Sequence, residues 1–113
     1  MNERDKKALI NIGKHIKVVF QYMTGISTLD KFSENSLVQD AVVFNLLQIG
    51  ELAKSKLSDS FKRAHSDIPW NDIYGFRNRL VHDYENIILT IVYEAITEDL
   101  PKLQNLIGKV IKD

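Results

Sequence analysis

The densest group of chemically capable side chains lies between residues 77 and 84. It contains Arg77, Asn78, His82, Asp83 and Tyr84. An imidazole titrates near neutral pH and can take up or return a proton, whereas a guanidinium keeps its charge and matches the shape of a phosphate. His82 could therefore act on the 2′-hydroxyl or the leaving oxygen of RNA while Arg77 stabilises charge on the phosphate, without a metal ion.

The other three residues of this cluster are predicted to support the pair, and each also has a purely structural explanation. Asn78 is expected within a helix, where an amide is not favoured, so its side chain is predicted to orient Arg77 or His82, or else lies on the surface. Asp83 either orients the imidazole or caps the next segment. Tyr84 could stack on a base, donate a hydrogen bond or pack at the edge of the core.

The spacing of Arg77 and His82 restricts how they can act together. Five residues on an ideal helix correspond to about 140° of rotation and about 7.5 Å of rise, so the two side chains do not share a face. They converge only if the helix loosens near His82 or if a second subunit brings its own copy close. A two-fold dimer would present two Arg and two His side chains to one ligand. The same spacing also fits an arginine and a histidine that simply cap a helix C-terminus.

Residues elsewhere in the chain offer few alternatives for catalysis. The absence of cysteine excludes disulfides, thiolate metal sites and a cysteine nucleophile. His15 is interpreted as a surface or packing residue, and His65 either contacts a phosphate or places a favourable charge near a helix C-terminus. The histidines lack the spacing of a zinc or iron site and no glycine-rich phosphate loop is present, so neither a metal nor a cofactor is predicted.

Apolar residues at helical spacing predict two helices in the first half of the chain. The first is expected from about Glu3 to Thr24, and the second is expected to reach about Leu57 after a turn-rich stretch at 27–35 that offers Ser33 or Asn35 as caps.

Two neighbouring residues inside the second helix bear on the cluster. Gly50 has a poor helix propensity, which predicts the close approach of another helix. Glu51 is either solvated or paired with Arg77 or Arg79.

The second half of the chain is predicted to add two further helices after one or two helical turns within 58–67. The third begins near 68–70, because a proline is tolerated in a first turn, and runs through Leu80. The fourth runs from about Asn86, and Pro101 is expected to kink it or divide it in two.

These elements predict an all-α, up-and-down bundle of four to five helices that forms a single domain over residues 1–113. The apolar stripes of the first and fourth helices exceed what one such bundle can cover, so a homodimer is expected. No segment is long and apolar enough to cross a membrane and the first residues lack the apolar stretch of a signal peptide, which favours the cytoplasm.

The charge distribution leaves the partner open. The formal net charge is zero, so the overall balance gives nucleic-acid binding no support. The stretch 54–65 is basic and the stretch 83–100 is acidic. They could receive an anionic ligand and a basic partner, or they are solvated helix faces.

The cluster resembles a known family signature. Residues 77–84 match every specified position of the Arg-Asn-x-x-x-His-x-Tyr motif of HepT-like proteins in the HEPN superfamily. Further similarity at Phe44–Glu51, Ile68–Trp70 and Leu100–Leu103 extends the resemblance over most of the chain from about Asp40 onward. The first 35 residues match nothing specific, so the subfamily stays open.

The resemblance implies a helical bundle that dimerises around Arg77 and His82 and cleaves RNA as a metal-independent endoribonuclease. Such proteins are toxins of toxin–antitoxin pairs, and their MNT antitoxins, which are minimal nucleotidyltransferases, bind the toxin and can transfer AMP from ATP onto the motif tyrosine. Carried over to this chain, Arg77 and His82 are catalytic, Asn78 is supporting and Tyr84 is the AMPylation target. Negative phosphates on Tyr84 would repel RNA from the site.

Two other hypotheses compete with this one. The chain could be a non-catalytic subunit that presents substrate to a nucleotidyltransferase or regulates it, which the neutral net charge fits as well. The intact pair of Arg77 and His82 favours the enzyme. A purely structural bundle would leave the polar cluster at 77–84 unexplained.

Overall fold

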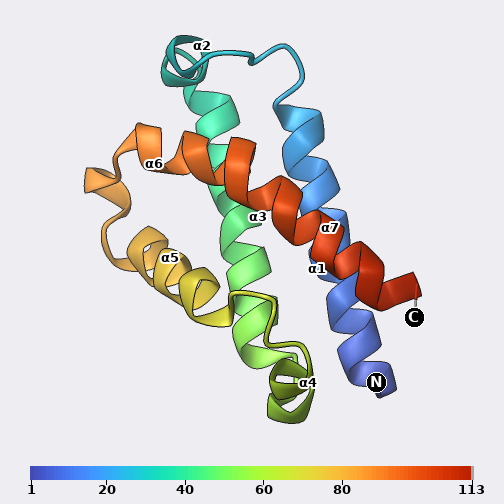
Figure 1. Cartoon of the computed structure of the whole chain (residues 1–113). Helices are drawn as coiled ribbons and strands as arrows, with labels where there is room; N and C mark the ends of the chain where they lie inside the picture. The colour runs from blue at the N-terminus through green and yellow to red at the C-terminus, as the bar shows by residue number, and fades with distance from the viewer. Residues whose placement is uncertain (113) are drawn as a thin grey trace.

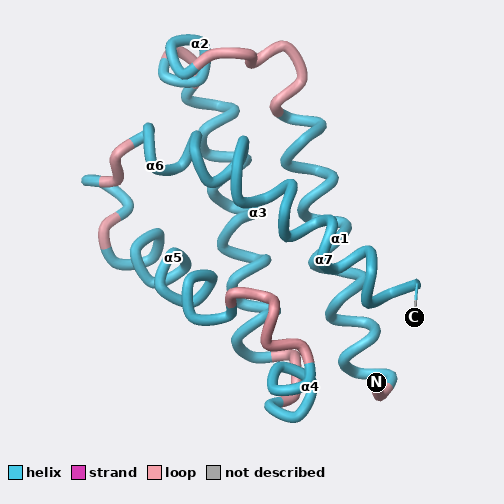
Figure 2. The backbone as a smooth tube through the Cα atoms, in the orientation of Figure 1, coloured by secondary structure: helices cyan, strands magenta, loops and turns pink. Residues whose placement is uncertain are grey.

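Residues 1–112 are described by a computed structural model, and within that range the chain forms helices joined by short loops, without a strand (Figure 1, Figure 2). The longer helices are α1 (Glu3–Tyr22), α3 (Ser36–Ser55), α5 (Trp70–His82) and α7 (Leu100–Lys112). The shorter ones are α2 (Leu29–Ser33), α4 (Asp59–Ala64), η1 (Tyr84–Asn86), α6 (Leu89–Glu94) and η2 (Ala95–Asp99). The predicted all-α bundle is confirmed.

One cluster of buried apolar side chains holds these helices together. Figure 1 shows α1 and α3 side by side, with α7 crossing in front of them and α5 on the side of α3 away from α1. The cluster includes Leu9, Ile12, Ile16 and Val19 of α1, Val42, Leu46 and Ile49 of α3, and Val92, Ile96, Leu103 and Ile107 of the C-terminal segment. From α5, Leu80 alone is buried in this core. Trp70, Ile73, Tyr74 and Phe76 of α5 are partly buried against it.

The first half of the chain follows the predicted pattern with one correction. The first helix ends at Tyr22, and the second runs from Ser36 to Ser55. Of the two candidate caps it is Asn35 that acts, since its side-chain oxygen accepts a hydrogen bond from the backbone N–H of Val38 at 3.0 Å. The stretch expected to be only turns and caps contains a further short helix, α2, because Thr28 caps it through the N–H of Lys31.

The second half contains the other difference from the predicted elements. The fourth helix begins at Leu89 and not near Asn86, because residues 84–86 form one tight 3₁₀ turn after α5. The interruption expected at Pro101 is present as the wide turns of η2, in which the N–H of Leu100 donates to the carbonyl of Ala95, five residues earlier. A proline cannot donate the next helical hydrogen bond and its ring crowds the preceding turn, which explains a wider turn at this point.

Of the helices formed by residues 1–112, none combines the length and the apolarity that a bilayer crossing requires.

Candidate functional site

The site is built where α5 lies against α3 at Gly50. A Cβ atom on residue 50 would lie 2.5 Å from Cβ and 2.6 Å from Cγ of Arg77. Such distances are far below van der Waals contact, so only glycine allows the two helices to pack this closely. The predicted close approach of another helix at Gly50 is confirmed, and the approaching residue is Arg77 itself.

The guanidinium of Arg77 is fixed by hydrogen bonds from both of its terminal nitrogens. Nη2 donates to Oε1 of Glu51 at 2.9 Å, and Nη1 donates to Oδ1 of Asn78 at 3.0 Å. The arginine side chain is 20% exposed and that of Glu51 is 43% exposed. Glu51, which was predicted to be either solvated or paired with an arginine, thus pairs with Arg77. Asn78 forms its hydrogen bond with Arg77 and not with His82. The contacts hold the guanidinium in one orientation at the protein surface.

His82 is the last residue of α5, and its side chain is exposed. The N–H of Asp83 donates to the carbonyl of Arg79 at 2.9 Å, so regular helical geometry extends as far as the histidine. Within residues 1–112 the imidazole has no hydrogen-bond partner, and no bond joins it to the Asp83 carboxylate. Asp83 instead stands between α5 and η1, at the end of one and the start of the other. The ring of His82 is free to meet a ligand or another subunit.

Tyr84 is joined to α3 by a hydrogen bond. Donating a hydrogen bond was one of the three roles left open for Tyr84, but its acceptor was not predicted. Its hydroxyl donates to Oδ1 of Asp40 at 2.5 Å. This hydrogen bond, together with burial and the negative charge of Asp40, raises the pKa of Tyr84 above its ordinary value. Since 44% of the side chain is still exposed, the ring presents an accessible edge while its hydroxyl is held by Asp40.

Large apolar side chains are exposed around this part of the molecule. Leu37 and Phe44 lie about one helical turn on either side of Asp40, and Val81 and Ile88 flank the segment that contains His82 and Tyr84. We call Leu37, Phe44, Val81, Tyr84 and Ile88 the apolar face. A group of exposed apolar side chains next to polar functional residues is typical of a surface that binds another protein.

The other two histidines have structural contacts. Nδ1 of His15 lies 2.8 Å from Oδ1 of buried Asn45, which joins α1 to α3. His65 ends α4 and its ring lies 4.5 Å from that of Phe61, while its carbonyl accepts a hydrogen bond from Nε1 of Trp70. The interpretations of a packing residue and a helix C-terminal residue are therefore confirmed. In the same described range, no three His, Asp or Glu side chains lie close enough to hold a metal ion.

A helical fold with the Arg-Asn-x-x-x-His-x-Tyr motif at the end of an exposed helix defines a protein of the HEPN class. The family model described as ribonuclease HepT-like matches residues 12–110. The chain belongs to this family.

Similar proteins of comparable length come from archaea and bacteria. "Probable ribonuclease HepT" of Thermococcus cleftensis is 30% identical over 112 residues, which is 99% of this chain and all of the relative. "Putative RNase TTE0752" of Caldanaerobacter subterraneus is 30% identical over 104 residues, 92% of this chain and 91% of the relative. A longer protein of Methanocaldococcus jannaschii, "Gamma-glutamylcyclotransferase and putative RNase MJ0434", is 31% identical over 97% of this chain and 49% of its own length. No solved structure matches the chain with significance.

Proposed function

We propose that this chain is an endoribonuclease that cleaves RNA without a metal ion, with Arg77 and His82 as its catalytic residues. Membership of the ribonuclease HepT-like family and the names of its relatives support RNA as the substrate. The observation that carries the assignment of residues is a guanidinium fixed by Glu51 and Asn78 on the same helix as an exposed imidazole that has no hydrogen-bond partner among residues 1–112. Arginine in a fixed orientation suits a phosphate, and a free imidazole suits proton transfer.

In the proposed reaction one imidazole accepts the proton of a ribose 2′-hydroxyl while that oxygen attacks the neighbouring phosphorus. The bond between phosphorus and the 5′ oxygen breaks, and a protonated imidazole gives its proton to the leaving oxygen. The products are a 2′,3′-cyclic phosphate and a free 5′-hydroxyl. Arg77 stabilises the negative charge that builds on the phosphate oxygens in the transition state.

We further propose that the site is shared by two subunits of a homodimer, each a single HepT-like domain. Regular helical geometry through His82 keeps Arg77 and His82 of one chain about 140° apart around α5. Local loosening of the helix, the other route to convergence, therefore has no support in the geometry. The apolar face beside His82 offers the kind of surface that a second copy would cover.

The resemblance of the motif also supports a toxin that is neutralised by a minimal nucleotidyltransferase antitoxin. In this proposal the phenolic oxygen of Tyr84 bonds to the α-phosphorus of ATP, pyrophosphate leaves and the phenolic proton is lost. The phenolic O–H that loses this proton donates a hydrogen bond to Oδ1 of Asp40 in the structure. The added AMP would place negative charge two residues from His82, where it repels RNA.

The experiment that tests catalysis uses an oligodeoxynucleotide with a single ribonucleotide, incubated with purified protein in excess EDTA. We expect cleavage on the 3′ side of the ribonucleotide to leave a cyclic phosphate, and we expect the all-DNA strand to stay intact. His82→Ala and Arg77→Ala should each reduce the rate by at least about 100-fold. Equal inactivity of the wild type and His82→Ala on this substrate and on total RNA would favour a non-catalytic nucleotidyltransferase subunit.

Mixing the two inactive variants tests the shared site. A heterodimer of Arg77→Ala and His82→Ala retains one arginine and one histidine, contributed by different chains. We expect partial recovery of activity after unfolding and refolding the variants together, and none when each is refolded alone. A mixture that forms heterodimers and yet stays inactive would contradict a site that works with one arginine and one histidine from different chains.

A further inference from the structure

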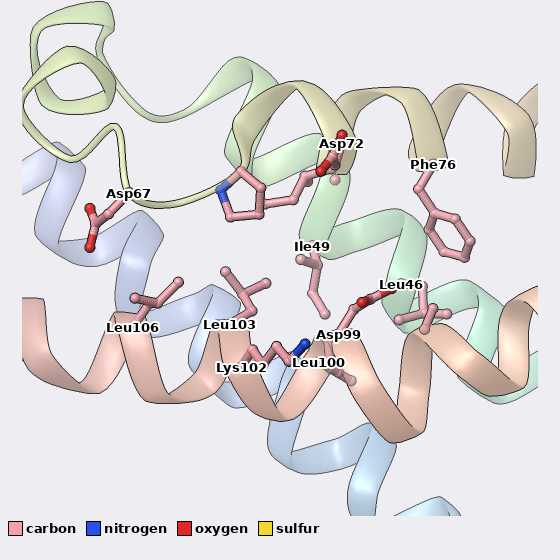
Figure 3. A pocket seen from close by; sticks show the side chains of 14 residues that line it. Leu46, Ile49, Asp67, Asp72, Phe76, Asp99, Leu100, Lys102, Leu103 and Leu106 are labelled. Carbon is pink, nitrogen blue, oxygen red and sulfur yellow. The ribbon is translucent and has the colours of Figure 1, made fainter.

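A groove of about 490 Å³ opens between α5 and α7, with α3 as its floor (Figure 3). Leu46, Ile49 and Gly50 line it from α3, Ile73 and Phe76 from α5, and Leu100, Leu103 and Leu106 from α7. Ile73, Phe76 and Leu106 keep part of their surface exposed to solvent. The groove thus leaves apolar surface uncovered in a region that none of the proposed catalytic residues lines.

The rim of this groove carries carboxylates on both sides and three acidic residues against one basic residue in all. Asp67 and Asp72 stand on the α5 side and Asp99 on the α7 side, and all three side chains are exposed. Lys102 is the one basic residue of the lining. Within residues 1–112 no ion pair engages these carboxylates, because the salt bridge found there joins Arg77 to Glu51. The rim therefore favours positive charge on whatever occupies the groove.

The length of the groove fits a helix lying in it. Its walls include the stretch from Pro69 to Phe76 on one side and the stretch from Asp99 to Leu106 on the other, with Asp67 and Ala95 lying before these stretches. Seven helical steps of 1.5 Å give about 10 Å, or about two helical turns, for each wall. In Figure 3 Phe76 of α5 projects toward α7, and Leu103 and Leu106 of α7 project toward α5 across this space. An amphipathic helix fills such a groove with apolar residues spaced three and four apart.

We propose that this groove binds an amphipathic helix of a partner protein, whose apolar stripe is flanked on both sides by lysine or arginine. The apolar floor supplies most of the affinity, and the carboxylates of Asp67, Asp72 and Asp99 select a basic helix and fix its position. Neither Arg77 nor His82 lines the groove, although Gly50, which does, lies directly against the side chain of Arg77. The inference therefore stands independently of the proposed ribonuclease activity.

The probe is a synthetic fluorescent helix of about 18 residues, with leucines three and four apart and lysines on both sides of them. Its anisotropy is titrated with the full-length protein. We expect saturable binding with one helix per chain. A second peptide with every lysine replaced by glutamate should bind at least about tenfold more weakly, because the acidic rim repels it.

Two kinds of variant locate the binding site. Asp67→Lys combined with Asp72→Lys should weaken binding at least about tenfold, while Asp30→Lys combined with Glu34→Lys, which changes exposed carboxylates of another region, should change it less than about twofold. Ala95→Leu should also weaken binding, because Ala95 lines the groove and a larger side chain takes up its volume. Thermal melts of each variant show whether it is folded.

Three results would overturn the proposal: no saturable binding, equal binding of the lysine and glutamate peptides, or binding unchanged by both sets of groove variants. Sedimentation adds a fourth outcome. If Leu106→Glu converts a dimeric wild type into folded monomers, a second copy of this chain covers the groove and the partner helix is excluded.

Discussion

The side chain of Arg77 occupies the space directly above Gly50, where any other residue on α3 would place its Cβ atom. This packing brings the guanidinium beside Glu51, the next residue of α3, with which it forms its ion pair. Gly50 and Arg77 therefore determine both how closely α5 packs on α3 and where the guanidinium lies. The position of the proposed phosphate-binding group depends on how closely α5 can approach α3.

Gly50→Ala should damage both stability and activity. The new methyl group would overlap Arg77, so α5 must move away from α3, and overpacking of this kind lowers the free energy of unfolding by about 1–3 kcal/mol. RNA cleavage should fall by at least about tenfold, because the guanidinium moves with the helix. Urea unfolding and initial rates on the single-ribonucleotide substrate measure the two effects.

Gly75→Ala is the matched control, because a Cβ at this position of α5 meets nothing within 4 Å. This variant should be stabilised by up to about 1 kcal/mol, since alanine favours the helix, and should keep its activity. If Gly50→Ala behaved like Gly75→Ala in both measurements, the close packing would have no role in the site.

Glu51 should matter for the orientation of Arg77 more than for stability. The pair is partly exposed, and such ion pairs contribute about 0–1 kcal/mol to folding. Glu51→Ala should nevertheless reduce kcat/KM by about 10- to 100-fold, because it frees one end of the guanidinium. Glu51→Gln keeps an acceptor oxygen and should retain more activity than the alanine variant. A Glu51→Ala enzyme with wild-type kcat/KM would mean that Asn78 alone positions Arg77.

The parts of the site that could be predicted from the sequence are those with a local signal. Gly50 stands out because glycine is a poor helix former, and the predicted close approach of a helix is confirmed there. Asn78 stands out because an amide is unusual inside a helix; its side chain accepts a hydrogen bond from Arg77 and is also exposed. Asp40 gave no such signal, since its partner Tyr84 lies 44 residues away in sequence. The fourth helix was predicted to start about one turn too early, near Asn86, because residues 84–86 form the 3₁₀ turn η1. Nothing in the types of these residues distinguishes a 3₁₀ turn from the first turn of an α-helix.

The hydrogen bond between Tyr84 and Asp40 predicts a titration that can be observed directly. Asp40→Ala removes the acceptor and its negative charge, so the pKa of Tyr84 should fall toward the ordinary value of about 10. Because folding raises this pKa, the bond stabilises the protein fully below the unfolded value and loses its effect as pH rises through the folded one. Tyrosinate absorbance against pH measures the shift, with Tyr84→Phe identifying which of the tyrosines is responsible. An unchanged titration in Asp40→Ala would show that the bond is not formed in solution.

The carboxyl group of Asp5, in the first turn of α1, should give the free energy of unfolding the opposite dependence on pH. Its buried carboxylate accepts hydrogen bonds from the backbone N–H and the hydroxyl of Ser58, both at 2.7 Å, which joins α1 to the start of α4. Burial by itself raises the pKa of Asp5, but the Ser58 hydrogen bonds, with the charges of Arg4 and the N-terminus, together lower it below the ordinary value. Since folding lowers this pKa, the stabilisation is fully present above the unfolded value of about 3.9 and is lost as pH falls through the folded one.

Asp5→Asn should therefore unfold about 1–3 kcal/mol more easily than the wild type at neutral pH, because an amide cannot replace a charged acceptor of two hydrogen bonds. The difference should shrink as the pH is lowered below the unfolded value, where the wild-type carboxyl also becomes neutral. Urea unfolding across the acid range measures it, with Glu3→Gln, an exposed carboxylate in the same helical turn, expected to change stability by less than about 0.5 kcal/mol. A difference between Asp5→Asn and the wild type that stayed constant down to the acid limit would mean that α1 and α4 are held together by packing and not by this charge.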